Sequence, residues 1–235
     1  MSNAVTIERR FRGPSESGQG GYSCGLLARA IDAPAAEVTL RAPPPLDVEL
    51  KLVGADDGAR LFYGGELIAE ATALSELELD LPAPVSLEEA AAAADSSPLH
   101  EHHAAPECFV CGPLREPGDG LQVLLGEVAG RDLVASPCRF DASLPNHEGM
   151  LFTEIAWAVL DCPSGWASLL VPELGTSVLG RMAARVVGEL EVGRDYVAVG
   201  WPLAHEGRKF DGGSALFDLE GQPHAYARAR WIELR

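Results

Sequence analysis

Residues 149–161 are apolar in a way that leaves few choices for the fold. A helix drawn over this segment carries apolar side chains on every side, at Met150, Leu151, Phe152, Ile155, Ala156, Ala158, Val159 and Leu160. A helix that is apolar all round must be buried on nearly all of its faces. Strand-like segments make up most of the remaining chain, so the sequence predicts a sheet wrapped around one central helix. Pro163 and Gly165 are expected to end that helix.

Two parts of the chain resemble each other in the order of their predicted elements. Residues 1–82 contain a strand, a glycine-rich turn, a buried helix and further strands, whereas residues 107–235 contain two strands, a loop, a buried helix and further strands. After each helix the two parts align with Arg41 over Arg185, and each part ends in a predicted hairpin. Internal repetition dictates architecture. We therefore predict two halves whose sheets join edge to edge, since this joint removes an exposed edge from each half.

A predicted linker at residues 83–106 separates the two halves. This segment is rich in Ala, Pro, Ser and charged residues, and it lacks a sustained apolar period. Ser86 followed by Glu89 three residues later is typical of a capping box, which predicts a short helix inside the linker.

The overall charge and the cysteine count exclude several classes of protein. A formal net charge of −17 disfavours nucleic acid and anionic membranes as partners. No apolar run approaches the ~18 residues of a membrane-spanning helix, and the first residues lack the apolar stretch of a signal peptide. Five cysteines, an odd number, argue against a secreted disulfide framework. We therefore expect a cytoplasmic protein with no nucleic-acid partner and no membrane partner.

Two short motifs carry a resemblance to a known family. "CFVCG" at residues 108–112, followed by "GDGLQV", resembles the opening of hotdog-fold acyl-CoA thioesterases. "VLDCPSGWA" at residues 159–167 resembles the end of their central helix. The resemblance implies an α+β fold, here a tandem (double) hotdog in which each half is a curved antiparallel sheet wrapped around a central helix. It also implies a thioester substrate.

The family's site residues are divided between the two halves of this chain. Family members open the helix with a His-Gly-Gly turn, nine residues before an Asp. The stretch Gln19-Gly20-Gly21 matches this turn with Gln in the His place, but Ala28 stands where the Asp would be. In the second half Asp161 matches the Asp, whereas residues 152–154 lack the turn. Because sites in this family lie across the interface of two folds, the resemblance implies one competent site, built from both halves.

The chemistry implied for that site is hydrolysis, with Asp161 as general base or nucleophile. Backbone N–H groups of Gly20 or Gly21, at the helix start, would receive the oxyanion, and Gln19 would donate an amide hydrogen bond beside it. Burial on a helix should raise the pKa of Asp161 and make it a better base near neutrality. Alternatively, the glycines form a plain tight turn, and Asp161 is an exposed acid in the last turn of its helix.

Four further residues have two interpretations each. Glu154 lies seven residues before Asp161, on the same helix face, and either helps in the site or pairs with an arginine. Asn146 either positions water near the site or caps the helix. Arg228 and Arg230 share one face of the last predicted strand, where they either bind the phosphates of coenzyme A or pair with carboxylates.

The cysteines raise the question of a metal. Cys108 and Cys111, with histidines just upstream at His100, His102 and His103, resemble a zinc ligand set. No second CxxC follows, and the resemblance to the family opening already explains the pair, so we expect no metal and keep zinc as the alternative. The remaining cysteines are expected to be small buried hydrophobes; they are Cys24, Cys138 and Cys162.

The sequence therefore predicts hydrolysis of an acyl-CoA or a related thioester. Two alternatives stay open, a non-catalytic hotdog that binds an acyl ligand and a hotdog hydratase or dehydratase. We expect no cofactor beyond the coenzyme A of the substrate, a small acyl thioester as partner, and further self-association into a homo-oligomer.

Overall fold

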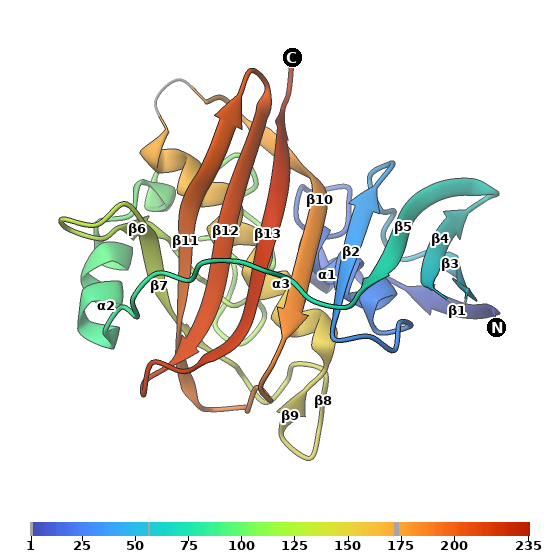
Figure 1. The fold of residues 1–235 in the computed structure, drawn as a ribbon, viewed down its shortest axis with the longest axis horizontal. Coiled ribbons are helices and arrows are strands. Elements are labelled where there is room, and N and C mark those ends of the chain that lie inside the picture. The colour runs from blue at the N-terminus through green and yellow to red at the C-terminus, as the bar shows by residue number, and fades with distance from the viewer. Residues whose placement is uncertain (1, 56, 172–173) are drawn as a thin grey trace.

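The computed structural model describes residues 2–55, 57–171 and 174–235. Eleven strands form one antiparallel sheet (Figure 1), in the order β1-β3-β4-β5-β2-β10-β13-β12-β11-β7-β6. The strands of this sheet are β1 (Ser2–Thr6), β2 (Ala35–Leu40), β3 (Glu49–Ala55), β4 (Gly58–Tyr63), β5 (Glu66–Leu74), β6 (Gly126–Glu127), β7 (Val134–Arg139), β10 (Ser177–Val186), β11 (Asp195–Glu206), β12 (Lys209–Asp218) and β13 (Pro223–Glu233). A separate small hairpin joins β8 (Asn146–His147) and β9 (Met150–Leu151). The helices are α1 (Gly20–Ala28), α2 (Leu87–Asp95) and α3 (Thr153–Trp166), with short 3-10 helices η1 (Arg9–Phe11), η2 (Pro98–His100) and η3 (Ala167–Leu170).

The strand order is palindromic about the pair β2–β10. From this centre β5, β4 and β3 follow on one side, and β13, β12 and β11 follow on the other. Val38 pairs with Met182 across the centre. The two residues are separated by the same offset as Arg41 and Arg185, which the sequence alignment placed over each other. The strands on the two sides of this pair therefore follow one another in a matching order.

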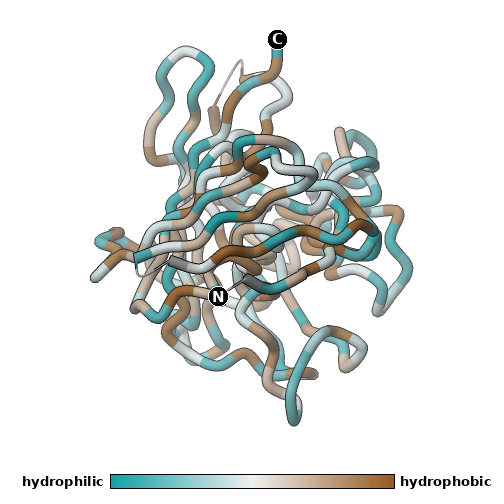
Figure 2. The backbone as a smooth tube through the Cα atoms, turned by 90° about the vertical axis from the view of Figure 1, so that its right-hand side faces the viewer, coloured by the Kyte–Doolittle hydropathy of each residue, from teal (hydrophilic) through white to brown (hydrophobic). Residues whose placement is uncertain are grey.

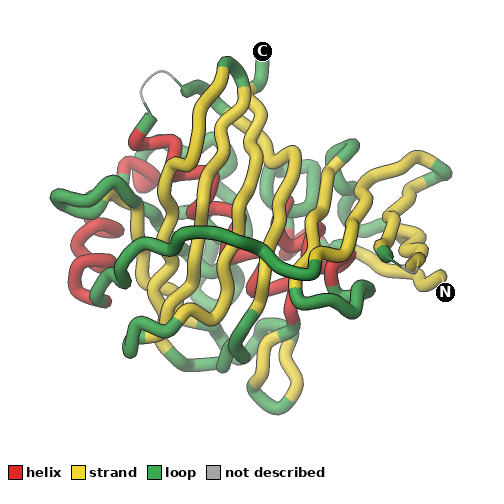
Figure 3. Tube along the Cα trace, in the orientation of Figure 1, coloured by secondary structure: helices red, strands yellow, loops and turns green. Residues whose placement is uncertain are grey.

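Helices α1 and α3 lie side by side on one face of the sheet (Figures 1 and 3). The residues of α3 from Glu154 to Gly165 are all buried, as the apolar pattern predicted. The sheet thus curves around two helices, one from each half. Figure 2 shows hydrophilic residues along the strands as well as in the projecting loops.

Helix α3 does not end where the sequence predicts. Pro163 lies inside the helix, which continues to Trp166. Beyond the proline, α3 packs directly on glycines of the sheet: a Cβ on Gly200 would lie 2.0 Å from the carbonyl oxygen of Pro163, and one on Gly212 would lie 2.0 Å from that of Ser164. Close packing on the sheet therefore overrides the proline signal, and Asp161 is an interior residue of the helix rather than a member of its last turn.

The chain between the halves crosses the opposite face of the sheet (Figure 3). The segment after β5 crosses this face as an extended loop (Figure 3) and packs Leu77, Leu79, Leu81 and Val85 onto it. Helix α2 follows, with the predicted capping box between Ser86 and Glu89 present. Much of the predicted linker is therefore packed onto the protein. Among the described residues, no helix combines the length and the hydrophobicity that crossing a bilayer requires.

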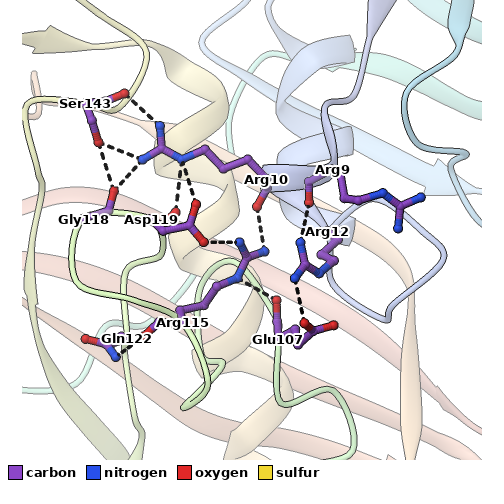
Figure 4. Close-up of polar contacts among 9 residues, drawn as sticks. All are labelled: Arg9, Arg10, Arg12, Glu107, Arg115, Gly118, Asp119, Gln122 and Ser143. Atoms are coloured by element: carbon purple, nitrogen blue, oxygen red, sulfur yellow. Dashed lines mark hydrogen bonds and ion pairs between the residues drawn. The ribbon is translucent and has the colours of Figure 1, made fainter.

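An arginine network orders the loop that opens the second half. Of the first strand predicted for this half, only the two residues Gly126–Glu127 form a strand. Arg115 is 5 % exposed and donates to the carbonyl oxygens of Glu107 and Arg10 and to the carboxylate of Asp119 (Figure 4). Arg10 donates in turn to the carbonyl oxygen of Gly118 at 2.6 Å. These bonds hold residues 107–119 against η1.

Candidate active site

The glycine-rich turn at the start of α1 is capped by the side chain that precedes it. Gln19 is the N-cap residue, and its Oε1 accepts a hydrogen bond of 2.6 Å from the backbone N–H of Tyr22. An N-cap side chain normally satisfies one of the free N–H groups of the first turn. The cap also fixes the amide plane of Gln19, so its Nε2 points to α3.

Asp161 of α3 receives that amide. Its Oδ2 accepts hydrogen bonds from Gln19 Nε2 at 2.5 Å and from the backbone N–H of Gly21 at 2.8 Å. Its Oδ1 is buried and has no hydrogen-bond partner among the described residues. Gln19 is 1 % exposed and Asp161 is 3 % exposed. The two halves thus bring together the turn and the acid that the sequence placed far apart.

Burial decides the protonation behaviour of Asp161. Removal from water is the largest effect and raises the pKa of the carboxyl to about 7, against the lowering effect of the Gly21 and Gln19 hydrogen bonds. A carboxyl with this pKa exchanges its proton near neutral pH, which is the range in which a general base is most effective.

The glycines of α1 let the two helices touch. A Cβ on Gly21 would lie 2.3 Å from the carbonyl oxygen of Trp157, and one on Gly25 would lie 2.5 Å from the Cα of Glu154. The start of α1 therefore meets the later part of α3, and the helices run antiparallel. The glycines serve helix contact first, and this contact brings the Gly21 N–H to Asp161.

These contacts reduce the number of N–H donors that could bind an oxyanion. The Gly21 N–H is bound to Asp161, and Gln19 Nε2 also donates to the carbonyl oxygen of Ala158 at 3.2 Å. The Gly20 N–H has no acceptor in the described part of the chain. Of the predicted donors, Gly20 is thus the one that remains available.

The other end of the helix pair contains an ion pair. Glu154 is 3 % exposed, and its Oε1 accepts a hydrogen bond of 2.8 Å from Arg29, the C-cap residue of α1. Both acids face α1, as the spacing predicted, but about two helical turns separate them. The structure thus places Glu154 with an arginine and away from Asp161.

Asn146 also lies away from Asp161. Its side chain donates to the carbonyl oxygens of Ala142 and Leu144 and accepts from the N–H of Gly149. These bonds shape the β8–β9 hairpin just before α3, near its Glu154 end. Asn146 is therefore neither the N-cap of α3, which is Phe152, nor a neighbour of Asp161.

Arg228 and Arg230 lie on the face of the sheet opposite α3. Their neighbours Ala227 and Ala229 are buried in the core that contains α3, whereas both arginines are exposed. Arg230 forms a two-bond ion pair with Asp211, at 2.7 and 2.6 Å. The sheet thus separates these arginines from Asp161.

Sequence reasoning missed two side chains at this contact. Arg29 was not named as a partner of Glu154, although it follows α1 directly and lies at the end of that helix that meets the start of α3. Cys162 was expected to be an ordinary buried cysteine, but its Sγ lies 3.8 Å from that of Cys108. Its position immediately after Asp161 was the only available signal.

No family model and no curated protein matches this sequence. Solved structures match over the whole chain at low identity. A candidate thioesterase from Novosphingobium aromaticivorans is 12 % identical with a TM-score of 0.66, and the match covers 100 % of this chain and 96 % of that one. A TesB protein from Mycobacterium avium subs paratuberculosis is 11 % identical, with 100 % and 93 % covered and a TM-score of 0.66. A protein of unknown function with a hotdog fold from Alicyclobacillus acidocaldarius is 12 % identical, with 100 % and 93 % covered and a TM-score of 0.64.

These likenesses agree with the motifs at 108–112 and 159–167, which resemble hotdog thioesterases. The chain has the hotdog fold.

Proposed function

We propose that this chain hydrolyses an acyl thioester such as an acyl-CoA, with Asp161 as general base or nucleophile. One observation carries the proposal: Asp161 is held through Oδ2 alone, while its buried Oδ1 has no partner among the described residues. A carboxylate fixed through one oxygen can present the other to a water molecule or to a carbonyl carbon. A pKa of about 7 leaves enough of it ionised to act at neutral pH.

In the general-base route, Oδ1 takes a proton from a water molecule, and the resulting hydroxide adds to the thioester carbonyl. The tetrahedral intermediate then collapses, the C–S bond breaks, and the leaving thiolate receives the proton. The Gly20 N–H, at the positive end of α1, is the donor for the oxyanion. A Cβ on Gly20 would lie 2.8 Å from Leu179 Cδ2 and 3.2 Å from Asp161 Oδ2. The side chain of Leu179 therefore packs at the start of α1, beside Asp161.

The proposal includes a tandem hotdog arrangement, with one site made by both halves. The palindromic strand order supports it, as does the pairing of Val38 with Met182 at its centre. The names of the similar structures, a candidate thioesterase and a TesB protein, support thioester chemistry. Coenzyme A enters only as part of the substrate. Arg228 and Arg230 are left out of its binding because they lie across the sheet from Asp161.

A second function is favoured by the burial of the site. Asp161 is 3 % exposed, and the Gly21 N–H is already bound to it. A hotdog protein that holds an acyl ligand without cleaving it would tolerate both features.

A panel of acyl-CoAs of different chain length separates the two functions. We expect the purified chain to release free thiol from at least one of them, and Asp161→Asn to lower that rate by about 10²–10⁴-fold. Calorimetry with the same compounds measures binding separately. Binding without thiol release would favour the ligand-binding function, and turnover that Asp161→Asn leaves unchanged would show that the chemistry lies elsewhere.

A further inference from the structure

Three cysteines from two distant parts of the chain meet behind Asp161. Cys108 and Cys111 belong to the loop that opens the second half, and Cys162 follows Asp161 in α3. Their three sulfur atoms all lie within 4.8 Å of one another. The residues are 4 %, 3 % and 5 % exposed, respectively. Such a buried thiol cluster needs an explanation beyond the packing of small hydrophobic side chains.

A histidine lies beside one thiol of the cluster, although its ring nitrogens are not within 4.8 Å of all three sulfur atoms. His103 Nε2 lies 3.2 Å from Cys111 Sγ, and the half-buried ring packs edge-on against Trp166. The other two candidate histidines, His100 and His102, are exposed. Three sulfur atoms and one imidazole nitrogen form a ligand set known for structural zinc sites.

The distance between the sulfur atoms of Cys108 and Cys162 suits a tetrahedral ion. With Zn–S bonds of about 2.3 Å, two sulfur ligands at a tetrahedral angle are about 3.8 Å apart. Cys108 Sγ and Cys162 Sγ are 3.8 Å apart. A disulfide would require about 2.05 Å between the same atoms. We infer that Cys108, Cys111, Cys162 and His103 bind one zinc ion in a closed, structural site.

N–H groups from outside the cluster lie beside two of the three sulfur atoms. Trp166 Nε1 donates to Cys111 Sγ at 3.3 Å, and Gln19 Nε2 lies 3.8 Å from Cys162 Sγ. Donors of this kind orient metal ligands and tune their basicity.

The loop that carries the CxxC pair is held in place independently of any metal. The Arg115 network fixes residues 107–119 against η1 (Figure 4). Gly112 closes the turn after Cys111, where a Cβ would lie 2.5 Å from the carbonyl oxygen of Cys108. Zinc would therefore bind a preformed loop and tie it to α3 at the residue next to Asp161.

His103 is the weakest of the four ligands. Its Nδ1 accepts a hydrogen bond of 2.9 Å from the backbone N–H of Ala105, which places the proton of a neutral ring on Nε2. To ligate through Nε2, the ring must move this proton to Nδ1 and give up the Ala105 bond. The three thiolates therefore provide most of the affinity.

Metal content of the intact chain tests the site. The protein is produced with added zinc, purified under reducing conditions without chelators and analysed by mass spectrometry for metals. We expect one zinc per chain, released when a mercurial reagent blocks the thiols. Cobalt(II) in its place should give a thiolate charge-transfer band and the visible spectrum of a tetrahedral ion.

Variants locate the metal. Cys108→Ser and Cys162→Ser should lose the zinc, while His103→Gln should keep it only at higher free zinc concentration. Cys138→Ser, at a buried free cysteine of β7, is the matched control and should retain one zinc. Wild-type protein without stoichiometric zinc, a Cys108–Cys162 disulfide in that protein, or equal zinc loss in the Cys138→Ser control would each overturn the inference, and the first two need no variant to fold.

Discussion

The two ends of the α1–α3 helix pair occupy equivalent places in the repeat but contain opposite chemistry. At one end the start of α1 meets Asp161, whose carboxylate is held by two N–H donors and no cation. At the other end the start of α3 meets the end of α1, and Glu154 is neutralised by Arg29 at 2.8 Å. Both acids are 3 % exposed. What distinguishes them is the partner, which is a guanidinium for Glu154 and two N–H donors for Asp161.

The residue before each helix also differs. In both cases this residue is extended, and it is Gln19 before α1 and Phe152 before α3. Gln19 provides a side chain that caps its helix and reaches Asp161, whereas Phe152 makes no side-chain cap. The Glu154 end thus contains an ion pair, although Glu154 Oε2 is buried without a hydrogen-bond partner among the described residues, as Asp161 Oδ1 is.

The largest expected effect comes from neutralising the two acids in parallel. Asp161→Asn should lower thioester hydrolysis by about 10²–10⁴-fold, while Glu154→Gln should leave the rate of the folded protein within a few-fold of the parent. The side-chain oxygen of Asn can take the place of Asp161 Oδ2 and accept the hydrogen bonds from Gln19 and Gly21, so the fold should persist. Steady-state rates of both variants, with circular dichroism as the folding control, test the contrast. Equal losses of hydrolysis rate in Asp161→Asn and Glu154→Gln would show that the two acids do not differ in their importance for the reaction.

The second prediction uses pH, since burial raises the pKa of Asp161 to about 7 from 3.8. The hydrolysis rate should rise about tenfold per pH unit below 7 and level off above it, because only the carboxylate acts as base. Stability should change in the opposite sense. The folded protein retains a proton that the unfolded chain has released, so the free energy of unfolding falls as pH rises from about 4 to 7.

Asp161→Asn supplies the reference for this pH effect, because Asn cannot ionise. Urea unfolding at pH 5 and pH 8 should show a larger loss of stability with pH for the parent than for the variant. Identical pH dependence of parent and variant would mean that Asp161 does not titrate in this range.

The smallest predicted effect concerns the close contact between helices α1 and α3 at Gly21. Gly21→Ala places a methyl 2.3 Å from the carbonyl oxygen of Trp157, so the helices must separate, at a cost of about 1–3 kcal/mol. Alanine also gains up to about 1 kcal/mol of helix propensity, so the measured loss understates the clash. The control is Gly180→Ala, whose methyl meets the side chain of Ile232 at 3.1 Å. Urea unfolding should show a clear loss for Gly21→Ala alone, and similar curves for the two variants would contradict the close contact.

Local patterns predicted much of the fold. The apolar residues of 149–161 predicted a buried helix, and α3 is one, but it begins only at Thr153. Met150 and Leu151 form β9 instead, and Phe152 is 40 % exposed. The Ser86–Glu89 box predicted α2, and the alternation in β13 placed Ala225, Ala227 and Ala229 inside with Arg228 and Arg230 outside. Each of these patterns depends only on residues that are close together in the sequence, so the sequence is sufficient to predict the element.

The site was predictable only through the repeat. The turn at Gln19-Gly20-Gly21 and the acid at Asp161 are 140 or more residues apart, and nothing local shows that they meet. The division of the family motif between the halves supplied that link. It could not show that the Gly21 N–H binds the acid itself, since this depends on the distance between two helix axes.

By itself, then, the sequence determined the elements whose causes are local: the buried helix, the hairpins, the helix cap and the alternating strand. Only the tertiary structure decided what met across the halves. In the tertiary structure α3 continues past Pro163 because Gly200 and Gly212 let the helix pack closely on the sheet. The packing of α1 against α3 also places Arg29 beside Glu154. The tertiary structure also brought Cys162 to Cys108, since side chains that are remote in sequence become neighbours only when the helices and the sheet are packed together.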